Sequence, residues 1–294
     1  MDWANSRLTA IAKASVARFS SLADTLDERT DSKACIVNGS GNMLPTPSTS
    51  HVNYNRVYEP AEDSYLLLDT LSAPSEISFL QDRFPPTSPS PLALEVGTGS
   101  GVVLAFLSAN AERILGRSDV ATIGTDVNDF ACKATRDTVK LAIAEIQPSD
   151  SPLFCGALKS DLTSAIRSRC IDVLVFNPPY VPTESLPNGT NHDDFADRDD
   201  FASDEAFERD SHLLALSYAG GVDGMETTNR LLEQLPDTLS ERGVAYILLC
   251  AQNWPEAVKE RIRSWPGAWS AETVGSSGKK AGWERLSILR IWRP

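Results

Sequence analysis

The sequence predicts an α/β protein built on an open, mostly parallel β-sheet. Candidate strands and helices alternate along most of the chain, and such alternation is typical of parallel sheets with right-handed crossovers. A glycine-rich turn follows the first of these strands, and a proline-rich turn ends a later one. With 294 residues, 41% of them hydrophobic, the chain can bury the core of one large domain.

The individual elements follow from the hydrophobic pattern, with short apolar runs as strands and longer amphipathic runs as helices. The last two strands are joined by a Gly/Ser/Lys turn at 275–282, so we expect an antiparallel hairpin at one edge of the sheet. The proline-rich residues 78–91 are expected to form a loop. Helices are expected at 61–72, 101–115, 128–146, 222–240 and 255–264, and strands at 92–96, 120–125, 153–157, 171–176, 243–250, 271–275 and 285–292.

The N-terminal part differs in composition from the rest. Residues 5–27 carry apolar side chains at helical spacing, which predicts an amphipathic helix, and residues 28–52 are rich in Ser, Asn, Gly and Pro, as linkers are. We therefore expect an appendage of helix and Pro/Ser-rich linker at 1–51 and one large domain at 52–294. Translation starting at Met43 would make the first 42 residues optional.

The run Gly-Thr-Gly-Ser-Gly at 97–101 directly follows the predicted strand 92–96 and precedes an apolar helix. A strand, a glycine turn and a helix N-terminus together let a ligand approach the backbone and meet free N–H groups. A dinucleotide-binding fingerprint needs its third glycine at position 102, which is Val102 here. With Glu95 two residues before the first glycine, the pattern is that of S-adenosylmethionine-dependent methyltransferases, although a purely structural turn is the alternative.

Two acidic residues follow later strands. Asp126 ends the strand at 120–125, where a carboxylate can accept both hydroxyls of a ribose, and its alternative role is to cap the next helix together with Asn128. Asp161 follows the strand at 153–157 and can accept from an adenine amino group while Leu162 packs on the ring. A helix cap is again the alternative for Asp161.

Asn177-Pro178-Pro179-Tyr180 ends the apolar strand 171–176. The two prolines fix their φ angles and have no N–H, so the turn presents carbonyl acceptors beside an amide and an aromatic ring. This combination suits a planar group that carries an NH2. A rigid turn with Asn177 as a local cap is the alternative interpretation.

Three blocks of sequence carry a family resemblance: Tyr-Glu-Pro-Ala-Glu-Asp-Ser-Tyr-Leu-Leu-Leu-Asp at 58–69, the glycine block at 95–101, and Asn-Pro-Pro-Tyr-Val at 177–181. On these blocks the chain resembles HemK-type protein glutamine methyltransferases, in the eukaryotic branch that modifies the translation termination factor. The resemblance covers roughly residues 52–294. It implies a Rossmann-like class I methyltransferase fold with a seven-stranded, mostly parallel sheet, an antiparallel last strand and helices on both faces.

The resemblance also implies the site residues, with no metal among their ligands. Ser64 stands where the family has threonine, and its hydroxyl is kept. The implied catalytic residues are Asn177, Pro178, Pro179 and Tyr180, and the residues implied to bind S-adenosylmethionine are Tyr58, Glu59, Pro60, Ser64, Glu95, Gly97, Gly99, Gly101, Asp126, Asp161, Leu162 and Asn177.

The resemblance further implies two protein partners: a translation release factor as substrate, methylated in its Gly-Gly-Gln loop, and a small zinc-binding activator in a heterodimer. The strand at 153–157 is expected at the open edge of the sheet, where it could accept an added strand. Cytoplasmic localisation, with the nucleus as a second compartment, is expected. The five cysteines form no CxxC pair, and no apolar stretch is long enough for a membrane span.

The charge of the chain bears on which functions compete with this interpretation. A net charge of −13 opposes stable nucleic-acid binding, although an adenine N-methyltransferase would grip an exocyclic NH2 with the same Asn-Pro-Pro-Tyr turn. The same residues are also compatible with a protein lysine methyltransferase or with a non-catalytic binding protein. The acidic stretch 184–212 is longer than the family pattern needs, and it is either a solvated insertion or a lid that orders on a basic protein surface.

Overall fold

The computed structural model describes residues 35–37, 43–146, 152–187, 204–278 and 285–294. The chain divides into two compact units, Met1–Cys35 and Ile36–Pro294. The predicted helix at 5–27 lies outside the described residues, and the fold described below is that of the second unit. The predicted boundary between appendage and large domain near residue 51 stays a prediction.

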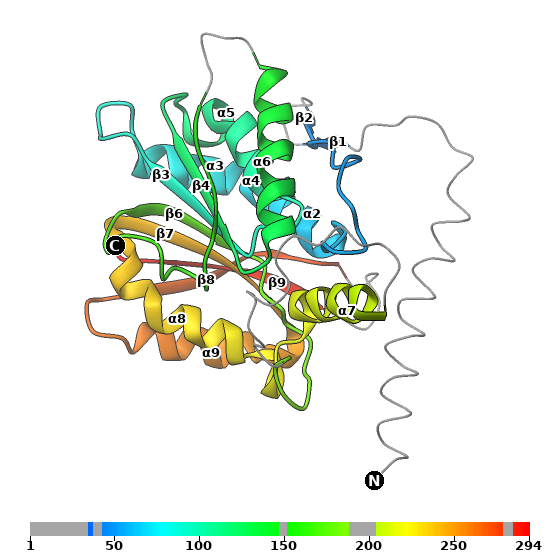
Figure 1. Ribbon diagram of the computed structural model, residues 1–294. Helices are drawn as coiled ribbons and strands as arrows, with labels where there is room; N and C mark the ends of the chain where they lie inside the picture. Colours follow the sequence, from blue (N-terminus) through cyan, green and yellow to red (C-terminus); the bar gives the residue numbers. More distant parts are fainter. Residues whose placement is uncertain (1–34, 38–42, 147–151, 188–203, 279–284) are drawn as a thin grey trace. The chain divides into compact units, whose positions relative to one another are not determined.

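A seven-stranded sheet in the order β5-β4-β3-β6-β7-β9-β8 is the centre of the fold (Figure 1). Neighbouring strands from β5 to β7 run parallel, whereas β9 is antiparallel to both β7 and β8. This confirms the mostly parallel sheet with its C-terminal antiparallel hairpin, and β5 lies at the edge as expected. The strands are β3 (Leu92–Val96), β4 (Ala121–Asp126), β5 (Leu153–Lys159), β6 (Ile171–Phe176), β7 (Leu239–Cys250), β8 (Ser270–Ser276) and β9 (Leu286–Trp292), with β1 (Cys35–Val37) and β2 (Met43–Pro45) in a separate two-stranded sheet.

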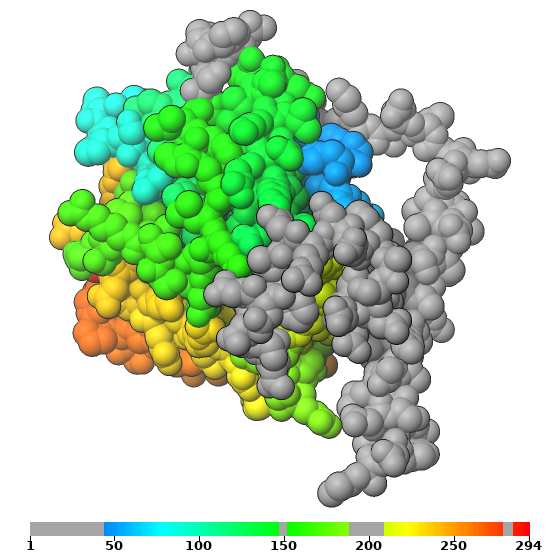
Figure 2. Space-filling view, in the orientation of Figure 1, coloured from blue at the N-terminus to red at the C-terminus, as the bar shows by residue number. Residues whose placement is uncertain are grey.

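Helices cover both faces of the seven-stranded sheet. Figure 1 shows α8 and α9 together on one side and α2 to α5 on the other, with α6 packed along α4. Figure 2 shows the exposed surface of α6 in green above the yellow-to-orange surface of α8 and α9. The helices are α2 (Glu62–Leu71), α3 (Pro74–Arg83), α4 (Val102–Ala109), α5 (Ala111–Leu115), α6 (Asp129–Ala144), α7 (Asp204–Tyr218), α8 (Glu226–Thr238) and α9 (Pro255–Arg263), with 3-10 turns at Val222–Gly224 and Ala251–Asn253.

Alternate residues of the strands build two separate cores. Val173 and Val175 of β6 pack with α2 to α5, whereas Leu174 and Phe176 pack with α8 and α9. All six residues of β6 are buried, as expected for a central strand of a parallel sheet that is covered on both faces. Among the described residues, no helix is long and apolar enough to cross a membrane.

Four sequence-based assignments are corrected. Residues 78–83 belong to α3 rather than to a loop, and the single helix expected at 101–115 breaks at Asn110. The helix expected from 222 begins at Glu226 after a 3-10 turn. Strand β7 begins at Leu239 rather than at 243. The helix α7 was not predicted. It contains the C-terminal end of the acidic stretch 184–212, while residues 188–203 of that stretch lie outside the described part of the chain.

Long-range polar contacts explain why α3 forms despite the prolines that follow it. Pro74 starts this helix at a position where its missing N–H costs nothing. The buried carboxylate of Glu76 accepts from Arg290 Nη1 at 2.8 and 3.0 Å and from the Tyr246 hydroxyl at 2.9 Å. Burial and the neighbouring Glu76 carboxylate both raise the pKa of Tyr246, so this hydroxyl stays a donor. These partners come from β7 and β9, which local sequence patterns do not connect to α3.

Candidate active site

The carboxyl ends of four neighbouring strands meet at one edge of the sheet. In the order β5-β4-β3-β6, these ends carry Asp161, Asp126, Gly97 and Asn177, so parallel pairing gathers four distant segments. The chain leaves β3 toward β4 on one side and later returns to form β6 on the other. Ligands of open α/β sheets bind at such a switch point, outside the carboxyl ends of the strands.

The glycine turn after β3 depends on positive φ angles. Gly97, Gly99 and Gly101 have φ values of 64°, 51° and 79°, which favour glycine. Gly97 and Gly99 line a cavity, whereas Gly101 lies behind it, where a Cβ would meet the Cα of Thr135 at 2.6 Å. Gly101 therefore lets α4 and α6 pack closely, and the structure does not bring it to the cavity.

Two buried carboxylates hold this turn in place. Glu95 accepts the backbone N–H of Leu104 at 2.8 Å, and Asp126 accepts those of Gly99 at 2.9 Å and Asn128 at 2.8 Å. Burial raises the pKa of Glu95 well above its ordinary value, and the nearby Asp126 adds to this shift. Burial also raises the pKa of Asp126, to about 6. Asp126 thus orders the turn and lines the cavity, whereas Asn128 is the residue that caps α6, its side chain accepting the backbone N–H of Phe130.

The loop after β5 brings Asp161 and Leu162 to the cavity. Leu162 is buried and has a φ of 51°, a conformation that is uncommon for a residue other than glycine and that occurs preferentially at functional sites. Asp161 is exposed and forms an ion pair through Oδ2 with Arg230 of α8, which also lines the cavity. The sequence pattern did not predict this arginine partner.

The Asn177-Pro178-Pro179-Tyr180 turn leaves β6 beside the glycine turn, which follows the neighbouring strand β3. Asn177 and Pro179 line the cavity, whereas Pro178 is buried outside its wall. Tyr180 packs against the core on the α2 side, and its carbonyl accepts from Asn253 Nδ2 at 3.1 Å. The structure thus does not bring Tyr180 to the cavity, where the sequence-based hypothesis had it stack on the substrate.

The Asn177 carboxamide has one end occupied and one end without a partner. Its Nδ2 donates to Asp63 Oδ2 at 3.1 Å, while its Oδ1 is buried and has no hydrogen-bond partner. Buried polar atoms are almost always paired, so this acceptor has room for a donor from a water molecule or a ligand. Asp63, at the start of α2, was not among the predicted site residues.

The segment 56–64 forms the opposite wall of the cavity. Tyr58 and Ser64 line it, as the resemblance implies, and Asp63 lies between them in the fold, accepting from both. Glu59 is exposed and Pro60 is half-buried, and neither lines the cavity. From the first sequence block, the start of α2 therefore contributes to the site, whereas Glu59 and Pro60 of the preceding turn do not.

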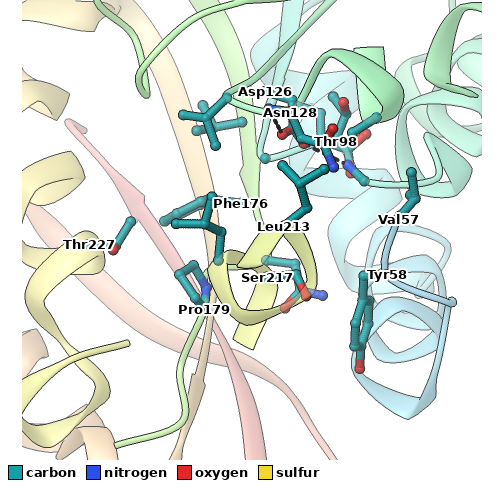
Figure 3. Close-up of a pocket in the computed structure, with 18 of the residues that line it drawn as sticks. Val57, Tyr58, Thr98, Asp126, Asn128, Phe176, Pro179, Leu213, Ser217 and Thr227 are labelled. Carbon is teal, nitrogen blue, oxygen red and sulfur yellow. Dashed lines mark hydrogen bonds between the residues drawn. The ribbon is translucent and has the colours of Figure 1, made fainter. Parts of the chain in front are cut away.

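Helix α7 completes the site. Leu213, Leu216 and Ser217 of this helix line the cavity, and Figure 3 shows Leu213 and Ser217 between the Val57 and Tyr58 side and the Phe176 and Pro179 side. Arg56 Nε pairs with Asp210 of α7 at 3.2 Å, and both side chains are largely buried. This ion pair fastens α7 to the segment before α2. No sequence signal pointed to α7, because its first residues, 204–212, belong to the acidic stretch.

The resulting cavity has a volume of about 590 Å3, which is within the range of small-molecule and cofactor sites. Its chemistry fits S-adenosylmethionine: backbone N–H groups at a helix N-terminus, two carboxylates at strand ends and apolar walls for a planar ring. Fold and cavity together define a class I S-adenosylmethionine-dependent methyltransferase.

Comparison with known proteins gives the family. The chain is 34% identical to the eRF1 methyltransferase catalytic subunit mtq2 of Schizosaccharomyces pombe over 85% of this chain and 96% of that protein. It is 32% identical to methyltransferase HEMK2 of Homo sapiens, over 85% and 98% of the two chains. A release factor glutamine methyltransferase of Bradyrhizobium diazoefficiens is 26% identical over 53% and 43%. No protein-family model matches the chain.

The chain belongs to the HemK-type family of eukaryotic release factor glutamine methyltransferases. It is a protein glutamine N-methyltransferase, and S-adenosylmethionine is its methyl donor.

Proposed function

We propose that this enzyme methylates the glutamine side chain in the Gly-Gly-Gln loop of the eukaryotic translation termination factor, in the cytoplasm. A relative that aligns over nearly its whole length supports the choice of target, because it carries eRF1 in its name. The observation that carries the proposal is the buried, unpaired Oδ1 of Asn177, a residue that lines the cavity. A primary amide supplies the N–H donor that this oxygen lacks.

In the proposed site, residues at the carboxyl ends of β3 to β5 would hold the cofactor, and Asn177 would hold the target amide. When bound, S-adenosylmethionine supplies an electrophilic methyl group. The residues proposed to contact the cofactor are Ser64, Glu95, Gly97, Asp126, Asp161, Leu162 and Asn177, and Tyr58 and Gly99 also line the cavity.

The chain contributes mainly positioning. An amide nitrogen is a poor nucleophile because its lone pair is delocalised, so holding it in line with the methyl group supplies the needed orientation. Asn177 Oδ1 is the proposed acceptor, and it also stabilises the positive charge that develops on the nitrogen. The methylated amide loses a proton to water afterwards, so the site needs no strong general base.

Methyl transfer from labelled S-adenosylmethionine tests this proposal. We expect label on the termination factor and none on its variant in which the Gly-Gly-Gln glutamine is alanine. Replacing Asn177 by alanine should lower kcat by about 100-fold or more, as loss of one well-placed polar group does in other enzymes. Equal labelling of both proteins would exclude the proposed target.

We further propose that the enzyme is the catalytic subunit of a heterodimer with a small zinc-binding activator. The support for this is the edge strand β5, whose side chains Leu153 and Leu158 are 65% and 39% exposed. Exposed apolar edge strands are where a partner can add a strand. If so, the isolated chain should be poorly soluble or unable to hold its cofactor.

Co-expression tests the activator proposal. Leu153→Asp on β5 should abolish co-purification of the activator. Leu141→Asp on α6, which is 52% exposed, should preserve it and serves as the matched control. Full activity of the chain without an activator would refute the proposal.

A further inference from the structure

The buried carboxylate of Asp63 joins three parts of the site. Its side chain belongs to a residue only 3% exposed, in the first turn of α2. Its Oδ2 accepts from Asn177 Nδ2 at 3.1 Å and from the Tyr58 hydroxyl at 3.2 Å. Its Oδ1 accepts the backbone N–H of Ser64 at 2.6 Å. Asp63 and Asn177 are 114 residues apart in sequence, and Asp63 also lines the cavity.

This contact decides which way the Asn177 carboxamide points. An ionised carboxylate only accepts hydrogen bonds, so it selects the NH2 end of the amide as its partner. The other end, Oδ1, is then the free acceptor, and it is the buried atom without a partner. In the opposite orientation, two oxygen atoms would face each other at Asp63, and Asn177 would present N–H donors to a target that is itself an N–H donor.

We propose that Asp63 is a positioning residue of the methyl transfer: it holds the Asn177 carboxamide with Oδ1 directed at the NH2 of the target glutamine. This inference rests on the proposed role of Asn177 as an acceptor for the target amide. Asp63 itself touches Asn177 rather than the reacting nitrogen. Tyr58 supports the same carboxylate oxygen, which keeps it in place while the NH2 end of Asn177 is bound.

A structural role is the competing explanation. A carboxylate in the first turn of a helix is stabilised by the helix dipole, and Asp63 is one of two acids there. Glu62, the other acid, is exposed and forms no contact with Asn177 in the described structure. Glu62→Gln therefore removes one charge from the same helix turn and is the matched control.

The test is a reciprocal exchange in the full-length enzyme, purified in its active form. We expect Asp63→Asn to lower kcat by about 10- to 100-fold, in the range seen when a partner that orients a site residue is lost. The dissociation constant of S-adenosylhomocysteine, measured by calorimetry, should stay within about threefold because the other cofactor contacts remain. Asn177→Asp should be similarly impaired, since it sets two carboxyl groups against each other.

The double variant with Asp63→Asn and Asn177→Asp is the decisive measurement. Its asparagine can donate to the new carboxylate, whose other oxygen again accepts from the target NH2. We expect kcat at least about tenfold above that of either single variant, which is a coupling that independent sites do not show. Glu62→Gln should keep the wild-type kcat.

Two outcomes would overturn the inference without touching the proposed function. One is wild-type kcat for Asp63→Asn while Asn177→Ala is inactive. The other is a parallel loss of thermal stability, cofactor affinity and kcat in Asp63→Asn, with no recovery in the double variant. By contrast, an active Asn177→Ala enzyme would contradict the proposed function itself.

Discussion

At the scale of single residues, burial sets the chemistry of the site. Asp126 and Glu95 are 8% and 3% exposed, and burial raises the pKa of both carboxyl groups. For Asp126 the pKa of about 6 lies above the ordinary value of 3.8. Its contribution to stability is therefore full below pH 3.8 and is lost as the pH rises through about 6. An ionised Asp126 thus costs stability, which fits a residue kept for binding.

Cofactor binding should depend on pH through Asp126. Above pH 7 the carboxylate is ionised and can accept from ribose hydroxyls, whereas below its pKa of about 6 it carries a proton. The affinity for S-adenosylhomocysteine should be constant from pH 7 to 8 and weaken by up to about tenfold per pH unit below 6. Calorimetry from pH 5 to 8 measures this. Asp126→Asn should bind weakly at every pH, and an unchanged slope in that variant would assign the effect to another group.

Gly101 is the residue at which backbone geometry is most restrictive. Its φ is 79°, and a Cβ there would lie 2.6 Å from the Cα of Thr135. We expect Gly101→Ala to lower the free energy of unfolding by about 1–3 kcal/mol, or more if α6 cannot move. Urea denaturation measures the loss. Gly278→Ala, where a Cβ meets nothing within 4 Å, is the control, and equal stability of both variants would contradict the packing argument.

At the scale of elements, helix α7 lines the site although no sequence pattern predicted it. Its Leu213, Leu216 and Ser217 line the cavity, and Asp210 pairs with Arg56. Because this helix contributes an apolar wall, the cavity on that side depends on how well α7 is held in place. The acidic stretch 184–212 was expected either to be solvated or to act as a lid. Its C-terminal end instead forms the first part of α7, a helix that lines the site.

Shortening the apolar wall should weaken cofactor binding. Leu213→Ala removes part of a half-buried side chain and should cost about 1–2 kcal/mol of binding free energy for S-adenosylhomocysteine. Calorimetry at pH 7.5 gives the value. Ser211→Ala changes an exposed position of the same helix and should bind as the wild type does. Equal affinities in the two variants would remove α7 from the binding site.

At the scale of the whole molecule, the position of Leu44 shows which part of the N-terminal region the described core includes. Leu44 of β2 is fully buried and belongs to the core that α2 to α5 cover. The chain from Leu44 onward therefore holds the described core residues.

Deleting residues 1–42 tests whether the N-terminal part is optional. Because Leu44 remains, we expect thermal unfolding and methyl transfer close to those of the full chain. Leu44→Ala in the full-length chain is the contrasting variant, and it should lower the free energy of unfolding by about 2–5 kcal/mol. A collapse of solubility or activity in the deletion would show that the first 42 residues are required.

Local patterns could predict the elements whose signal is contained in a few residues. Two segments were recognisable from local patterns: the strand and glycine turn at 92–101, and the strand and proline turn at 171–180. In each, a run of apolar residues ends abruptly at glycines or prolines, which impose a particular backbone conformation. The edge position of β5 and the C-terminal hairpin followed from alternation and a short turn. Helix α3 was missed because its partners, Tyr246 and Arg290, lie 170 and 214 residues from Glu76.

The sequence by itself determined which groups are available: an amide beside two prolines, acids after strands and glycines that permit close approach. Only the tertiary structure decided which of them act together, because hydrogen-bond partners depend on distance in space. It excluded Tyr180, Glu59, Pro60, Pro178 and Gly101 from the cavity wall and added Arg230 and α7. It also brought Asp63 to Asn177, a contact that no local pattern encodes, because the two residues lie 114 positions apart and meet only when α2 packs beside the end of β6.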